Sequence, residues 1–86
     1  FSLDTLADEV SDELNVDETL PPVVLEPSPD NRGEVQVEAD RTRIKRVLTN
    51  LLSNAQKHAD GTPHVVLRWR RVERGVRIEV ADQGPG

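Results

Sequence analysis

The sequence predicts an α/β fold, a two-layer sandwich in which a mixed sheet carries helices on one face. Apolar residues recur at helical spacing in residues 3–14 and 41–59, and this predicts two helices. Apolar and polar residues alternate in residues 35–39 and 65–80, and this predicts strands. The chain has 86 residues. We therefore expect one small domain that buries roughly 60–65% of the surface exposed by its unfolded chain.

The first predicted helix has its apolar residues at i, i+3, i+4, i+7 and i+11: Leu3, Leu6, Ala7, Val10 and Leu14. Ser2 is its candidate N-cap, and acidic residues in the first turns favour the positive end of the helix dipole. Residues 21–22 are both proline and end this regular structure. Residues 23–25 predict a short strand, which leads into a loop of helix-breaking residues at 27–33.

The segment 35–39 alternates with period two and predicts a strand with one buried face. Asp40 follows it and is placed to cap the second helix, which Gly61 and Pro63 would end. The apolar residues of this helix cover one sector of its surface: Ile44, Val47, Leu48, Leu51, Leu52 and Ala55.

An antiparallel hairpin is predicted after the second helix. One face is apolar along both strands: Val65, Leu67, Trp69, Val76, Ile78 and Val80. Arg68 and Arg70 share the other face, and residues 73–75 form the turn.

Composition excludes several classes of function. The chain has no Cys, so it offers neither a disulfide framework nor a thiolate metal site. It has one Trp, one Phe and no Tyr, and therefore lacks the stacking platforms that hold single-stranded nucleic acid. No apolar run approaches the ~20 residues of a membrane span, so we expect no direct membrane contact by this segment.

Charge is strongly segregated along the chain. Residues 1–31 hold nine Asp or Glu and no Lys or Arg, whereas residues 32–86 hold eleven basic and seven acidic residues. The acidic third is either a solvated face or the counterpart of a basic remainder whose field favours an anionic ligand.

The second helix carries a polar strip. At ~100° per residue, Asn50, Asn54 and Lys57 lie close together at the border of the apolar sector. The Asn side chain offers an amide oxygen to a hard cation such as Mg²⁺, and the Lys side chain offers a charge to phosphate. The strip favours nucleotide chemistry, and the alternative is an ordinary solvated helix face.

The end of the last strand carries a carboxylate. Asp82 has the parity of the inward-facing residues, so its side chain should point inward and need a partner. Gly84 and Gly86 follow and allow close approach of the backbone. A carboxylate with such space beside it suits the amine of adenine, and the alternative is a simple turn over residues 82–86.

Together these motifs resemble the ATP-binding domain of sensor histidine kinases, in the GHKL (Bergerat-fold) superfamily shared with DNA gyrase, MutL and heat-shock chaperone ATPases. The segment RIKRVLTNLLSNAQKHA is similar to the N box of this family, and VADQGPG is similar to its first glycine box. The resemblance covers residues 35–86 and implies ATP and Mg²⁺ as ligands.

The resemblance also implies roles for seven residues near the nucleotide: Asn50, Asn54, Lys57, His58, Asp82, Gly84 and Gly86. Asn54 would correspond to the Mg²⁺ ligand, with Asn50 near the phosphates and Lys57 in contact with them. Asp82 would bind the adenine amine, and the two glycines would shape the wall and the start of a lid. His58 would lie near the nucleotide, or would be an ordinary histidine at a helix end.

Position 50 separates branches of the superfamily. The ATPases and serine kinases that resemble this helix carry a Glu four residues before the metal-binding Asn, and that Glu acts as a base. Asn50 cannot accept a proton, and a neutral phosphoacceptor imidazole needs no strong base. The sequence therefore favours a histidine kinase.

The resemblance implies transfer of the ATP γ-phosphoryl group to a histidine on a separate dimerisation domain, and onward transfer to a response regulator. We expect residues 1–86 to be a single cytoplasmic catalytic domain, cut before the ATP lid and the second glycine motif, in a parent protein anchored in the cell membrane. Without its lid the fragment should be inactive alone. The alternative is a degenerate, non-catalytic interaction module that binds a partner through the acidic helix and the Pro-rich loop.

Overall fold

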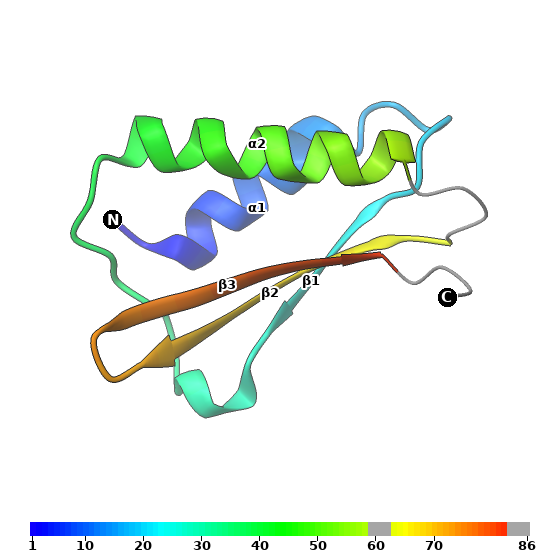
Figure 1. The fold of residues 1–86 in the computed structure, drawn as a ribbon. Coiled ribbons are helices and arrows are strands. Elements are labelled where there is room, and N and C mark those ends of the chain that lie inside the picture. The colour runs from blue at the N-terminus through cyan, green and yellow to red at the C-terminus, as the bar shows by residue number, and fades with distance from the viewer. Residues whose placement is uncertain (59–62, 83–86) are drawn as a thin grey trace.

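The computed structural model describes residues 1–58 and 63–82, with Asp82 described by its backbone alone. Its elements are α1 (Leu3–Leu14), β1 (Val23–Pro27), a 3-10 helix η1 (Pro29–Asn31), α2 (Arg41–His58), β2 (Val65–Val72) and β3 (Gly75–Asp82). The sheet has the order β1-β2-β3, with β1 parallel to β2 and β2 antiparallel to β3. Both helices cover one face of this mixed sheet (Figure 1). The predicted α/β class is therefore confirmed.

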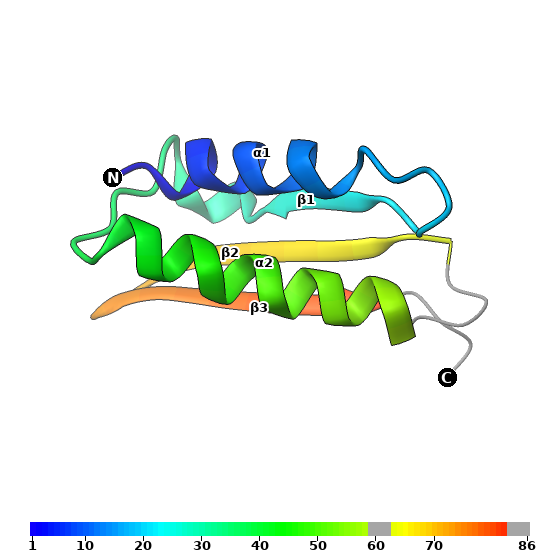
Figure 2. The same cartoon turned by 90° about the horizontal axis from the view of Figure 1, so that it is seen from above.

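The core lies between the helices and the sheet. Seen from above, α1 lies along β1, whereas α2 crosses obliquely over β2 and β3 (Figure 2). Both layers contribute fully buried apolar side chains: Leu3, Leu6, Val10, Leu48, Leu52, Val65 and Leu67. Within the described residues, none of the helices is long and apolar enough to cross a membrane.

Local side chains begin both helices where the sequence predicts. The Ser2 hydroxyl accepts a hydrogen bond from the Thr5 amide at 3.2 Å, and the Asp40 carboxylate accepts one from the Arg43 amide at 3.2 Å. Each satisfies a backbone donor that the helix itself leaves without an acceptor. The predicted N-caps are therefore confirmed.

The strand predicted at residues 35–39 is wrong, because the structure has only an isolated bridge there, between Gln36 and Ser2. Val35 is buried and Gln36 is exposed, as the alternation indicates. The backbone of this segment, however, pairs with the N-terminus: the Leu3 amide donates to the Val35 carbonyl oxygen and the Val37 amide to that of Phe1, both at 2.8 Å. The alternation correctly indicated the burial of Val35, whereas Ala39 is exposed, and it did not indicate which part of the chain is the partner.

The apolar sector predicted on α2 is narrower than its composition suggests. Leu48 and Leu52 are buried, whereas Val47 is 47% and Leu51 48% exposed in the structure. The buried residues of α2 recur at every fourth position, namely Leu48, Leu52 and Gln56. The prediction that Val47 and Leu51 belong to the buried apolar face of this helix is therefore wrong.

Ion pairs join the two helices. Lys45 Nζ lies 2.9 Å from a Glu9 carboxylate oxygen and 3.0 Å from one of Glu13, and Arg41 also pairs with Glu9. Hydrogen bonds from Lys45 and Arg41 lower the pKa of Glu9, and those to Glu9 and Glu13 raise the pKa of Lys45. Part of the charge segregation along the sequence thus serves packing of α1 against α2.

The predicted hairpin is confirmed, and β2 also anchors the loop after β1. The β2–β3 ladder runs from Val65↔Asp82 to Val72↔Gly75, and Gly75 has a φ of +150° that favours glycine. The buried Asn31 side chain donates to the Trp69 carbonyl oxygen at 3.1 Å and accepts from the Arg71 amide at 2.9 Å. It thereby occupies the place of a strand partner beyond the end of β1.

Candidate functional site

The polar strip lies on the C-terminal half of α2. Asn50, Asn54, Lys57 and His58 are all exposed on this helix, while Leu52 and Gln56 lie on its buried side. The helical period explains the separation, because residues 52 and 56 are one turn apart on the face toward the core. The strip is therefore open to a ligand along its length.

Gln56 holds this half of α2 in place, and the sequence did not single it out. Its side chain is only 3% exposed, and its Nε2 donates to the Pro21 carbonyl oxygen at 2.8 Å. The Val65 amide donates to the next carbonyl oxygen, that of Pro22, at 2.9 Å. Two adjacent proline carbonyls thus join α2 to the start of β2. The signal was a polar residue one turn after buried Leu52, on the buried side of the helix.

The start of β2, which these contacts hold, pairs with the end of β3. Val65 is the ladder partner of Asp82, so the strand end lies beside the segment that Gln56 anchors. Figures 1 and 2 show the C-terminal end of α2 and the end of β3 at the same end of the molecule. Position 82 continues the parity of Ile78 and Val80, which pack against the core.

Three sequence predictions fall outside this description. The Asp82 side chain, and Gly84 and Gly86 entirely, lie outside the described residues. The structure therefore brings the backbone of the Asp82 position to the end of the molecule that carries Asn54.

The exposed strip fits a metal-bound nucleotide chemically. In the part of the chain that the structure describes, no hydrogen bond or ion pair engages the side chains of Asn50, Asn54 or Lys57. Nor do residues 1–58 and 63–82 bring together three or more His, Asp or Glu side chains to hold a metal. Mg²⁺ in nucleotide sites commonly takes one or two protein oxygens and completes its shell with phosphates and waters. One amide oxygen beside an ammonium group suits that pattern.

Comparison with known proteins agrees with this geometry. A family model described as histidine kinase-, DNA gyrase B- and HSP90-like ATPase matches residues 39–86, which include α2, the hairpin and the residues after it. Fold and motifs together define an ATP-binding domain of the α/β class. The chain belongs to this family of histidine kinase-, DNA gyrase B- and HSP90-like ATPases, and the resemblance to the kinase ATP-binding domain is confirmed.

Among the similar proteins are a sensory kinase and a sensor protein. The chain is 43% identical over 51 residues to the adaptive-response sensory kinase SasA of Prochlorococcus marinus, a match that covers 58% of this chain and 13% of that protein. It is 30% identical over 47 residues to the phosphate regulon sensor protein PhoR of Haemophilus influenzae, covering 55% of this chain and 11% of that protein. The chain thus spans a small part of the curated relatives that it matches. No solved structure shows a significant match.

Proposed function

We propose that the chain is the ATP-binding catalytic domain of a two-component sensor histidine kinase, which transfers the γ-phosphoryl group of ATP to a histidine on a separate dimerisation domain. Within the family, Asn50 is the residue that favours a histidine kinase over an ATPase or a serine kinase. It is exposed on α2 one turn before Asn54 and cannot act as the base that hydrolysis of ATP or a serine acceptor would need. The sensory kinases among the relatives support the same choice.

The residues on α2 act at the phosphate end. The amide oxygen of Asn54 serves as a protein ligand for Mg²⁺, and the Lys57 ammonium group contacts phosphate oxygens, with Asn50 and His58 beside them. Bound Mg²⁺ supplies charge neutralisation at the phosphates. Positioning and electrostatics are the main protein contributions to phosphoryl transfer, so an exposed strip on a helix that Gln56 anchors suits this role.

The residues at the end of β3 act at the adenine ring of the nucleotide. Asp82 accepts a hydrogen bond from the exocyclic amine of adenine, and Gly84 and Gly86 shape the wall and the start of a lid. Residues 1–86 belong to one catalytic domain. The full-length protein is anchored in the cell membrane with this domain in the cytoplasm, and passes the phosphoryl group to a response regulator.

The test is to look for phosphohistidine. Full-length protein containing its dimerisation domain is incubated with γ-labelled ATP and Mg²⁺, and protein-bound label is examined for stability in acid and in alkali. We expect label that is lost in acid and retained in alkali, because a phosphorylated imidazole hydrolyses readily in acid whereas a phosphoserine ester survives it.

Asn54→Ala and Thr42→Ala provide the matched comparison, since both positions are exposed on α2 and only the first lies on the strip. Asn54→Ala should abolish most of the label and Thr42→Ala should retain it. Acid-stable label, or release of free phosphate without any labelled protein, would overturn the proposal in favour of a serine kinase or an ATPase. Nucleotide binding without either product would favour the non-catalytic module.

A further inference from the structure

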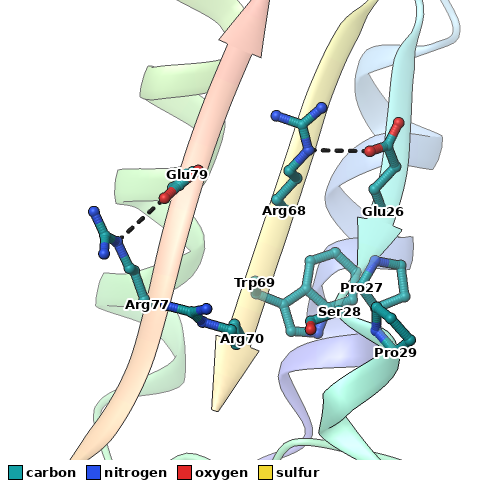
Figure 3. Close-up of a pocket in the computed structure, with 9 residues that line it drawn as sticks. All are labelled: Glu26, Pro27, Ser28, Pro29, Arg68, Trp69, Arg70, Arg77 and Glu79. Atoms are coloured by element: carbon teal, nitrogen blue, oxygen red, sulfur yellow. Dashed lines mark hydrogen bonds and ion pairs between the residues drawn. The ribbon is translucent and has the colours of Figure 1, made fainter. Parts of the chain in front are cut away.

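The helix-free face of the sheet carries a hollow that the proposed nucleotide site does not use. It has a volume of ≈ 350 Å³ and lies between the end of β1 and the middle of the β2–β3 hairpin (Figure 3). Pro27 and Pro29 form an apolar wall together with the edge of Trp69, and the arginines Arg70 and Arg77 lie toward the other side. The α2 strip lies on the helix face and contributes no residue to this hollow.

The charges in the hollow do not balance. Its three arginines face two glutamates: Arg68 Nε lies 3.0 Å from a Glu26 carboxylate oxygen, and Arg77 Nε lies 3.2 Å from one of Glu79. Arg70 has no carboxylate partner among the residues that the structure describes. The hollow therefore carries one positive charge in excess.

The excess charge sits where two arginines oppose each other. Arg70 and Arg77 are direct ladder partners across β2 and β3, and Figure 3 shows the Arg70 side chain reaching toward β3. Like charges directly opposite on a sheet face are destabilising. One carboxylate between the two guanidinium groups would remove the repulsion, because each group can donate paired hydrogen bonds to it.

The apolar wall and the open shape of the hollow indicate which kind of molecule would present the carboxylate. Pro27 and Pro29 are exposed and face the arginines, so an apolar group beside the acid would pack on them. The hollow is open to solvent, whereas small-molecule sites bury most of their ligand. An acidic side chain and its apolar neighbour, presented by a larger partner, fit an open surface of this kind.

We propose that the helix-free face binds an acidic segment of a partner protein, with one carboxylate between Arg70 and Arg77 and an adjacent apolar side chain against Pro27 and Pro29. The excess of one positive charge matches a single carboxylate. This surface is independent of the nucleotide strip, which lies on the opposite side of the sheet.

The test uses the full-length protein and a fluorescent, acetylated and amidated short peptide of alternating Glu and Leu, with a peptide of alternating Gln and Leu for comparison. Fluorescence anisotropy reports binding to the wild type and to the double variant Arg70→Gln/Arg77→Gln. Arg74→Gln, at the exposed hairpin turn, removes one positive charge outside the hollow and is the control for a general effect of charge.

We expect the Glu peptide to bind the wild type, and its affinity to be lower by about fivefold or more in the double variant. Added salt should lower the affinity further, because it screens pairs of exposed charges. Arg74→Gln should change the affinity less than about twofold. Nucleotide binding should be the same in the double variant, so failure here is distinguishable from failure of the proposed function.

A charge swap provides a second readout. The variant Arg70→Glu/Arg77→Glu should no longer bind the Glu peptide and should instead bind a peptide of alternating Lys and Leu. Binding of the Lys peptide also shows that the variant is folded. Three outcomes would overturn the proposal. The Glu and Gln peptides could bind equally well, or Arg74→Gln could lose as much affinity as the double variant. The third outcome is displacement of the labelled peptide by a single-stranded oligonucleotide but not by excess unlabelled Glu peptide.

Discussion

The Gln56 side chain donates a hydrogen bond to the carbonyl oxygen of Pro21 across 2.8 Å and so ties α2 to the segment that enters β1. The contact holds Gln56 on the buried side of the helix, where its side chain is only 3% exposed. Because residue 56 points to the core, Asn54 and Lys57 on either side of it are directed outward. A buried polar side chain thereby supports an exposed polar strip.

Replacement of Gln56 should destabilise the fold. We expect Gln56→Ala to lower the free energy of unfolding by about 2 kcal/mol, since it removes a buried side chain and leaves the Pro21 carbonyl without its donor. Urea denaturation measures the change. Gln36→Ala, at an exposed glutamine, should cost less than about 0.5 kcal/mol. Equal costs at the two positions would show that the contact does not stabilise the fold.

Asn54→Ala should weaken nucleotide binding chiefly when Mg²⁺ is present. Loss of one oxygen ligand to a charged centre corresponds to about a tenfold rise in Kd. Calorimetry on the full-length protein, with Mg²⁺ and with EDTA, measures the difference, and Thr42→Ala is the control on the same helix. An equal loss in both conditions would argue against a metal ligand at this position.

Asp82→Asn should weaken binding with and without Mg²⁺, because the carboxylate is assigned to the base and not to the phosphates. We expect about a tenfold rise in Kd for ATP, and a smaller change for a purine nucleotide that lacks the exocyclic amine. Asp12→Asn, exposed on α1, controls for the loss of a negative charge. No change with either nucleotide would remove the assignment.

Asn31→Ala should destabilise the fold because two backbone groups of β2 lose their partner. The side chain bonds the Trp69 carbonyl oxygen and the Arg71 amide, and it is fully buried. We expect a cost of about 2 kcal/mol in thermal or urea unfolding. Asn50→Ala, an exposed position on α2, should be neutral in stability, and a similar loss at both positions would contradict the bridging role.

Acid should weaken the contact between α1 and α2. Hydrogen bonds from Lys45 and Arg41 lower the pKa of Glu9 in the folded chain. Their stabilisation is therefore fully present above the ordinary carboxyl pKa of about 4.3, and is lost as the pH falls through the lower pKa of the folded state. The Tm of the wild type should fall more between about pH 6 and pH 3 than that of Glu9→Gln. Asp12→Asn should keep the wild-type dependence, and identical slopes in all three proteins would contradict the effect.

Local signals made much of the fold predictable. Ser2 and Asp40 begin their helices through side-chain hydrogen bonds to residues three positions ahead, and such contacts depend on neighbours in the sequence alone. The hairpin was equally local, because two alternating strands meet at a turn that ends in glycine. The polar strip on α2 followed from the helical period, and its proposed chemistry from the residue types.

Tertiary structure decided what the sequence left open, because a period records which positions are buried but not what buries them. Residues 35–39 alternate as a strand would, yet they pair with the N-terminus. On α2 the apolar residues allowed several rotations of the helix, and packing against α1 and the sheet chose the one that buries Gln56 and exposes Leu51. The opposition of Arg70 and Arg77 likewise depends on the register of two strands, which only the folded chain sets.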